Sequence, residues 1–292
     1  MKEISVISGK GGTGKTTITA SLAQLMNNSV YADCDVDAPN LDLVLEPKVH
    51  EKEAVKVSKV AERVNIENCI ECNKCRENCR FDAINQDLTI NKFKCEGCGV
   101  CQYICPNNVI KLQEKESGDI YNSTTRFGPM VYGKLRIGEE ATGKIVDKVK
   151  EKARKVAKTK SKDHILIDGS PGVGCPVIAS INGVDHVLIV TEPTVSGIHD
   201  LKRVIELTNN FNLEKTVCIN KYDLNKQKTK EITKIAQKNN TDTVKIPYNE
   251  NINKTIAQGK TIFESINLDT TIKQNDLFEV AGAIFQIWKK IH

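Results

Sequence analysis

The chain has 292 residues, 39% of them hydrophobic and 27% charged, which is typical of a soluble globular protein with one large domain or two smaller ones. The formal net charge of +5 is modest and concentrated in residues 144–162, so nucleic-acid binding is not expected. No run reaches the roughly 20 apolar residues of a membrane span, and the first ten residues lack a signal-peptide core; we therefore expect a cytoplasmic protein.

The first predicted element is a strand over residues 3–8 that leads into a glycine-rich loop. Residues 9–17 read GKGGTGKTT, and the next stretch, ITASLAQLM, has helical periodicity. A GxxxxGKT pattern between a strand and a helix predicts a phosphate-binding loop, with Lys15 on the β- and γ-phosphates and Thr16 on Mg²⁺. The residues expected to bind the nucleotide here are Gly11, Gly12, Thr13, Gly14, Lys15, Thr16 and Thr17.

Lys10 makes this loop more specific. The string KGGTGKT resembles the deviant Walker loop of the MinD/ParA class of ATPases, which includes the nitrogenase iron protein. In that class the first lysine reaches across a dimer to the partner's nucleotide. The resemblance therefore implies that Lys10 has this role and that ATP binding closes a homodimer.

Residues 31–37, YADCDVD, look like the second strand and the switch I segment of the same class. The resemblance implies that Asp35 orients the water that attacks ATP. The roles of Asp33 and Asp37 stay open.

Two matched cysteine runs follow. Both have the spacing CxxCxxCxxxC, and each cysteine of the second run lies 26 residues after its counterpart. Because cytoplasmic cysteines are kept reduced, this internal repeat predicts metal ligands rather than disulfides. The runs consist of Cys69, Cys72, Cys75 and Cys79, and of Cys95, Cys98, Cys101 and Cys105.

The second run ends in Cys105-Pro106, as in bacterial two-cluster ferredoxins, whereas Arg80 follows Cys79. This resemblance implies two [4Fe–4S] clusters, each completed by the last cysteine of the other run. Zinc is the rival metal, but it needs neither the third CxxC step nor the Cys-Pro ending. The expected ligands are Cys69, Cys72, Cys75 and Cys105 for cluster I, and Cys95, Cys98, Cys101 and Cys79 for cluster II.

The cysteine repeat is expected to form a small α+β ferredoxin domain over residues 60–114, inserted into an ATPase domain made of residues 1–59 and 115–292. Residues 121–143 return the chain to the ATPase, and their sequence predicts no role.

Residues 165–168, ILID, form a predicted buried strand that ends in an acid and is followed by GSPG. They look like the Walker B strand and switch II, which implies that Asp168 holds Mg²⁺ through water and that the Gly172 amide senses the γ-phosphate. Cys175 lies seven residues after Asp168, as does a cluster ligand of the nitrogenase iron protein. Cys175 is therefore a candidate bridging metal site, and an idle thiol is the alternative.

The base-binding side is expected near residues 216–220, TVCIN. The resemblance implies that Asn220 contacts adenine, with Pro247 and Tyr248 as candidates for packing against the base. Asn220 also begins an NKxD-like sequence, which makes guanine the competing base.

Predicted helices at residues 144–159, 196–209 and 226–239 alternate with apolar strands. This alternation predicts an α/β P-loop NTPase with a mostly parallel sheet covered on both faces. The amphipathic residues 277–291 are expected to pack on the sheet, and membrane association through them is the less favoured alternative.

The motifs together predict a Mg²⁺-dependent ATPase that binds ATP and ADP, forms an ATP-dependent homodimer and carries two [4Fe–4S] clusters. The first hypothesis for its function is ATP-gated electron transfer to a redox or metalloprotein partner. The alternatives are an ATP-dependent carrier that assembles iron–sulfur clusters or metals through Cys175, and a ParA-like positioning or assembly ATPase whose clusters sense redox state.

Overall fold

The computed structural model describes residues 1–139, 142–268 and 274–292. The chain forms two compact units. The first, here the ATPase unit, consists of residues 1–53, 120–134 and 142–292; the second, here the cysteine unit, consists of residues 54–119 and 135–141. The predicted insertion, residues 60–114, lies within the cysteine unit.

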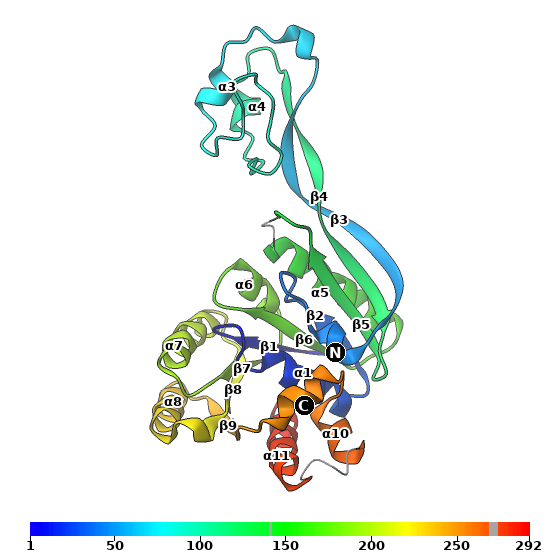
Figure 1. Cartoon of the computed structure of the whole chain (residues 1–292), viewed down its shortest axis with the longest axis vertical. Helices are drawn as coiled ribbons and strands as arrows, with labels where there is room; N and C mark the ends of the chain where they lie inside the picture. Colours follow the sequence, from blue (N-terminus) through cyan, green and yellow to red (C-terminus); the bar gives the residue numbers. More distant parts are fainter. Residues whose placement is uncertain (140–141, 269–273) are drawn as a thin grey trace. The chain divides into compact units, whose positions relative to one another are not determined.

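A nine-stranded sheet has the order β3-β4-β5-β2-β6-β1-β7-β8-β9 (Figure 1). From β5 to β9, all neighbouring strands pair in parallel, which confirms the predicted mostly parallel α/β fold. The strands are β1 (Lys2–Ser8), β2 (Ser29–Asp33), β3 (Lys48–Arg63), β4 (Ile110–Thr124), β5 (Pro129–Leu135), β6 (His164–Pro171), β7 (His186–Thr191), β8 (Glu214–Asn220) and β9 (Asp242–Ile246).

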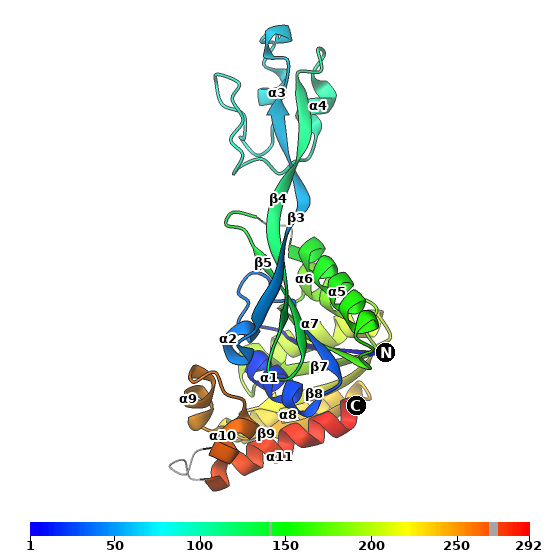
Figure 2. The same cartoon turned by 90° about the vertical axis from the view of Figure 1, so that its right-hand side faces the viewer.

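Helices cover both faces of the sheet in the ATPase unit (Figures 1 and 2). The helices are α1 (Lys15–Leu25), α2 (Leu41–Leu45), α3 (Lys74–Glu77), α4 (Val100–Ile104), α5 (Thr142–Thr159), α6 (Cys175–Ile181), α7 (Val195–Asn210), α8 (Lys226–Lys238), α9 (Asn251–Ala257), α10 (Ile262–Leu268) and α11 (Gln274–Ile291), with 3₁₀ turns at Ile66–Asn68 and Tyr222–Leu224.

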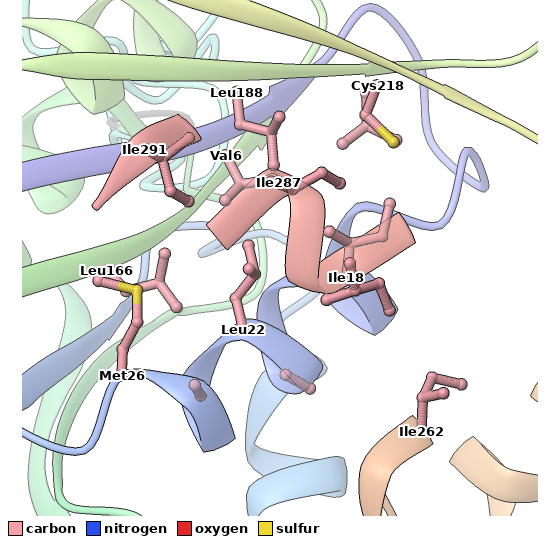
Figure 3. Packing of buried hydrophobic residues seen from close by; sticks show 14 of the residues in the cluster. Val6, Ile18, Leu22, Met26, Leu166, Leu188, Cys218, Ile262, Ile287 and Ile291 are labelled. Carbon is pink, nitrogen blue, oxygen red and sulfur yellow. The ribbon is translucent and has the colours of Figure 1, made fainter. Parts of the chain in front are cut away.

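The two faces of the sheet follow from the alternation of side chains along each strand. Ile4 and Val6 of β1 belong to one core with α1, α2, α10 and α11, whereas Ile7 points to the opposite face, where α5, α6 and α7 pack on β2, β6 and β7. Figure 3 shows Ile287 and Ile291 of α11 beside Leu22 of α1 in the first core. The predicted packing of the last helix on the sheet is confirmed, and no helix in the described part of the chain is long and apolar enough to cross a bilayer.

Three strands were not predicted from the sequence. β3 and β4 are long, and most side chains of β3 are exposed, so they lack the apolar alternation that identifies a half-buried strand. β5 lies within residues 121–143 and pairs in parallel with β2, placing Tyr132 opposite Asp33. The region without a predicted role therefore contributes a neighbour to the strand that leads into switch I.

Candidate functional site

The phosphate-binding loop (P-loop, residues 9–16) connects β1 to α1 as predicted. Gly12 and Gly14 have φ angles of 78° and 93°, a left-handed conformation that glycine adopts without steric cost. At Gly14 a Cβ atom would also lie 2.4 Å from the side-chain nitrogen of Asn220. The second of these glycines is therefore required both by its backbone conformation and by its close neighbour.

Asp168 joins the two P-loop residues predicted to bind phosphate and Mg²⁺. The Lys15 Nζ atom lies 2.8 Å from Asp168 Oδ1, and the Thr16 hydroxyl donates to Asp168 Oδ2 at 2.7 Å. Thr19, which sequence reasoning missed, donates to Oδ1 at 3.0 Å. The strand register brings Asp168 close to the P-loop, because Asp168 pairs with Val6 of β1, two residues before that strand ends. Asp168 is fully buried, so these polar contacts replace its lost hydration.

Lys15 is surrounded by further acids. Its Nζ atom lies 3.6 Å from Asp35 Oδ2, and although burial opposes its charge, Asp168, Asp35 and Asp33 raise the pKa of Lys15. Burial raises the pKa of Asp35, while Lys15 opposes that shift. The lysine predicted to bind phosphate and the acid predicted to orient water are thus brought together in one buried cluster.

Asp33, whose role the sequence left open, organises switch I (residues 34–37). It is fully buried, and its two carboxylate oxygens accept the backbone N–H groups of Asp35 at 3.0 Å and Leu41 at 3.1 Å. Burial, with Asp168 nearby, raises the pKa of Asp33. Asp33 therefore fixes the loop that carries Asp35 and the start of α2.

Switch II (residues 169–172) is bonded to the P-loop side and to switch I. The Gly172 amide donates to the Ser8 carbonyl at 2.8 Å, with Gly172 at φ 100°. The Ser170 hydroxyl donates to the Cys34 carbonyl at 2.7 Å. The predicted contact of Gly172 with a γ-phosphate stays a prediction, and in this conformation its N–H is already paired.

On the base side, Asn220 supports the P-loop. Its side-chain nitrogen donates to the Thr13 carbonyl at 2.7 Å, and its oxygen accepts from Lys221 N at 3.0 Å. Asp223, the last residue of the NKxD-like sequence, accepts from Tyr248 N at 2.7 Å. The adenine contacts predicted for Asn220, Pro247 and Tyr248 stay predictions.

A single cavity connects these parts of the ATPase unit. It is lined by Gly12 and Lys15 of the P-loop, by Asp35, by Asn220 and by Tyr248. Pro247 is buried beside it, whereas Tyr248 is 47% exposed. The cavity thus joins the groups predicted to bind phosphate to the residues predicted to lie near the base.

Lys10 does not line this cavity. Its Nζ atom lies 2.7 Å from Glu192 Oε1 and 3.0 Å from the Ser196 hydroxyl, and Lys221 lies 3.5 Å from the other Glu192 oxygen. Burial opposes the charge of Glu192, but Lys10 and Lys221 lower its pKa. Sequence reasoning missed Glu192 and Ser196 because only the fold brings the end of β7 beside the P-loop.

The cysteine unit has two cavities with four cysteines each. None of the eleven cysteines forms a disulfide. Each cavity combines three cysteines of one run with the last cysteine of the other. One is lined by Cys69, Cys72, Cys75 and Cys105, the other by Cys95, Cys98, Cys101 and Cys79. These are the two crossed sets that the sequence predicts, although their role as ligands stays a prediction.

Backbone amides point at several of these sulfurs. Ala83 N lies 3.4 Å from Cys79 Sγ, and Val109 N lies 3.3 Å from Cys105 Sγ, in the equivalent place of the repeat. Burial, together with Cys95, Cys98 and Cys79, raises the pKa of Cys101 to about 11. Within residues 1–139, 142–268 and 274–292, no three His, Cys, Asp or Glu side chains are arranged to hold a single metal ion.

Cys175 lies outside both cavities. It is exposed and begins α6, with residues 173 and 174 between it and switch II. Its Cβ atom lies 3.3 Å from the place a side chain at Gly143 would occupy, so the start of α5 approaches it closely. Cys34 and Cys218 are buried, and burial raises the pKa of both thiols.

Comparisons with known proteins identify the family and the fold of the chain. Residues 4–262 match the family described as the CobQ/CobB/MinD/ParA nucleotide binding domain. An uncharacterized protein of Methanocaldococcus jannaschii is 42% identical over 226 residues, covering 76% of this chain and 79% of the relative.

Two solved structures share the fold with a TM-score of 0.54. One is the septum site-determining protein MinD of Pyrococcus horikoshii complexed with Mg-ADP, 18% identical, covering 100% of this chain and 98% of its own. The other is the MinC:MinD cell division protein complex of Aquifex aeolicus, 17% identical, covering 98% and 96%.

Proposed function

Because the chain belongs to the CobQ/CobB/MinD/ParA family of nucleotide-binding domains, we propose that it is a Mg²⁺-dependent ATPase that closes into a homodimer when it binds ATP. The observation that carries this proposal is the contact of one buried carboxylate, Asp168, with both Lys15 and Thr16. The MinD structure from P. horikoshii, which has the same fold, is described as a complex with Mg-ADP.

Each role in ATP hydrolysis can be assigned to particular residues of the site. The P-loop amides and Lys15 would bind the β- and γ-phosphates. Thr16 and Asp168 would hold Mg²⁺, which supplies positive charge to the phosphate oxygens. Asp35 would orient the water that attacks the γ-phosphorus, so that the bond to ADP breaks and phosphate leaves.

The base side favours adenine over guanine. In NKxD GTPases the aspartate binds guanine, but here Asp223 accepts the Tyr248 amide and does not line the cavity. The proposed function is tested by phosphate release with ATP or GTP in the presence of Mg²⁺. We expect turnover of ATP, reduced by EDTA, and much slower turnover of GTP; no ATP turnover above that of a Lys15→Met variant would contradict the proposal.

The Lys10–Glu192 pair predicts how readily the dimer closes. Lys10 can reach a partner's nucleotide only after it leaves Glu192 and Ser196. Glu192→Gln removes this ion pair and frees Lys10, so it is expected to lower the ATP concentration for half-maximal dimerisation. The pair is partly exposed and therefore weak, so the change should be at most about fivefold. Light scattering across an ATP titration measures the change.

Glu231→Gln is the control for this prediction, because Glu231 pairs with Lys228 on α8, away from the nucleotide cavity. Lys10→Ala should prevent dimerisation. An unchanged ATP dependence in Glu192→Gln would contradict the idea that Glu192 holds Lys10 back.

We further propose that the cysteine unit binds two [4Fe–4S] clusters. The support is that each cavity is lined by four thiols, three from one run and the last from the other, as in the crossed pattern of two-cluster ferredoxins. Amide hydrogen bonds to Cys79, Cys95 and Cys105 suit sulfurs that carry negative charge. Each cluster would supply one-electron redox chemistry.

The comparisons favour a switch ATPase that positions or assembles a partner. The support is that one structure of the same fold is a complex between MinD and a second protein, MinC. That its clusters sense redox state is part of our proposal. In this function, oxidising the clusters changes the ATP dependence of dimerisation. Titrating ATP against the reduced and the oxidised protein measures the effect.

Electron transfer is the second candidate, favoured by the paired cysteine sets themselves. In this function, ATP accelerates the oxidation of pre-reduced clusters by an acceptor, and a Cys72→Ala variant loses this acceleration while ATP turnover persists. Oxidation kinetics that are the same with and without ATP would rule this candidate out.

A third candidate function is that of a carrier for a cluster or a metal, because the thiol of Cys175 is exposed. A carrier would deliver iron to an apoprotein only while Cys175 is present. Undiminished delivery by Cys175→Ala, with unchanged absorption from the cysteine unit, would exclude it.

A further inference from the structure

Lys150 is a buried lysine for which the proposed chemistry has no direct use. It lies on α5 and is 3% exposed. Its Nζ atom donates to the carbonyls of Ala179 at 2.9 Å, Ser180 at 3.2 Å and Asn182 at 2.7 Å. A lysine has three N–H donors, so all of them are satisfied by the last turn of α6 and its C-cap residue.

These contacts fix the carboxyl end of α6. Burial lowers the pKa of Lys150, and the carbonyls at a helix C-terminus are the part of a helix that favours a cation. At the other end of α6, Gly143 of α5 packs directly against Cys175, where a Cβ atom would lie 3.3 Å from the Cys175 Cβ. Helix α6 is therefore held to α5 at both of its ends.

The same helix is bonded to the two switches. The Ser180 hydroxyl oxygen lies 3.4 Å from Ser170 N in switch II. Ser170 in turn donates to the Cys34 carbonyl at 2.7 Å, and Cys34 N donates to the Asp168 carbonyl at 2.8 Å. A continuous set of hydrogen bonds thus leads from Lys150 through α6 to the residues that flank the nucleotide cavity.

We propose that Lys150 is a positioning residue for ATP hydrolysis: by holding α6 on α5, it fixes switch II, and through Ser170 the switch I backbone, in the arrangement that hydrolysis requires. This inference rests on the proposed ATPase function. It adds that a residue with no contact to the P-loop affects the hydrolytic step more than nucleotide binding, because the P-loop has further anchors in the side chains of Asn220 and Asp168.

The test compares Lys150→Met with Lys148→Met, the same change at a half-exposed lysine of the same helix. We expect Lys150→Met to lower kcat by about 10- to 100-fold, as a small displacement of catalytic groups does, with the Kd of a fluorescent ATP analogue within about threefold of the original. Hydrogen exchange should accelerate in residues 169–182, which contain switch II and α6. Lys148→Met should change none of these.

Unchanged kcat in folded Lys150→Met would overturn the inference, as would equal losses of kcat and of nucleotide affinity. If Lys150→Met does not fold, Ser170→Ala tests the same connection: it should lower kcat without weakening nucleotide binding, and an unchanged kcat again overturns the inference. An inactive wild-type protein would instead disprove the proposed ATPase, and the exchange measurement would still show whether Lys150 holds α6.

Discussion

Replacing Asp35 with asparagine is expected to lower the rate of ATP hydrolysis by about 10²- to 10⁴-fold, the usual contribution of a positioned acid–base group. ATP binding should persist, because the phosphates are predicted to bind the P-loop and Lys15, whereas the Asp35 carboxylate lies 3.6 Å from Lys15 and is not expected to bind phosphate itself. Phosphate release and binding of a fluorescent ATP analogue, measured on the same preparation, separate the two effects. The variant should therefore accumulate as an ATP-bound dimer.

Asp163→Asn is the matched control, since Asp163 bonds to Asn28 and does not line the nucleotide cavity. It should hydrolyse ATP at the normal rate. Normal hydrolysis by Asp35→Asn would show that another residue orients the water, with Asp37, which also lines the cavity, as the next to test.

The environment of Asp35 also predicts a pH dependence. Burial raises the pKa of Asp35, and in the proposed mechanism this group acts as the charged carboxylate. As pH falls, protonation should therefore reduce kcat at a higher pH than an ordinary aspartate would. A pH–rate profile with saturating ATP measures the midpoint, and loss of activity only near the pKa of an exposed aspartate would contradict this reasoning.

The crossed cysteine sets predict the result of paired substitutions. Cys105 belongs to the second run but lines the cavity of Cys69, Cys72 and Cys75. Cys72→Ser with Cys105→Ser should therefore damage one site and leave about half of the reconstituted iron, whereas Cys98→Ser with Cys105→Ser should damage both sites and leave almost none. Iron and sulfide analysis with EPR of the reduced protein provides the readout.

If each site were instead formed by the four cysteines of one run, the iron contents of the two double variants would be reversed. In that case Cys98→Ser with Cys105→Ser would leave half of the iron, and the variant with Cys72→Ser would lose nearly all of it. Cys175→Ser is the control, because Cys175 lies in the ATPase unit, outside both cavities, and its loss should leave the iron content unchanged.

Local patterns predicted much of the ATPase unit. Strand β1, the P-loop and helices α7 and α8 appeared within about one residue of their expected bounds, because glycine spacing and apolar periodicity are properties of adjacent residues. The crossed cysteine sets were implied by the resemblance to two-cluster ferredoxins, which the matched CxxCxxCxxxC runs and the Cys105-Pro106 ending carry. Strand β5 carried no such signal, because its place beside β2 depends on the whole sheet.

The contacts that sequence reasoning missed are those made only by the fold. Glu192 contacts Lys10, and Lys150 contacts α6, between residues that are far apart in the sequence. A lysine in a lysine-rich amphipathic helix is more often solvated than buried. Asn220 and Gly172 were predicted to contact the nucleotide, but their hydrogen bonds to Thr13 and Ser8 depend on the register of neighbouring strands. Sequence motifs thus identified these residues without revealing their protein partners.

The central claim, an ATP-closed dimer of a protein with two [4Fe–4S] clusters, is tested most directly by native mass spectrometry. The sample is anaerobically reconstituted Asp35→Asn protein with Mg²⁺ and ATP, so that hydrolysis does not reverse the dimer. We predict a dimer whose mass includes one ATP and two clusters per chain. A monomer with bound ATP would contradict the switch mechanism, and a dimer with ATP but no iron or sulfide would contradict the role of the cysteine unit.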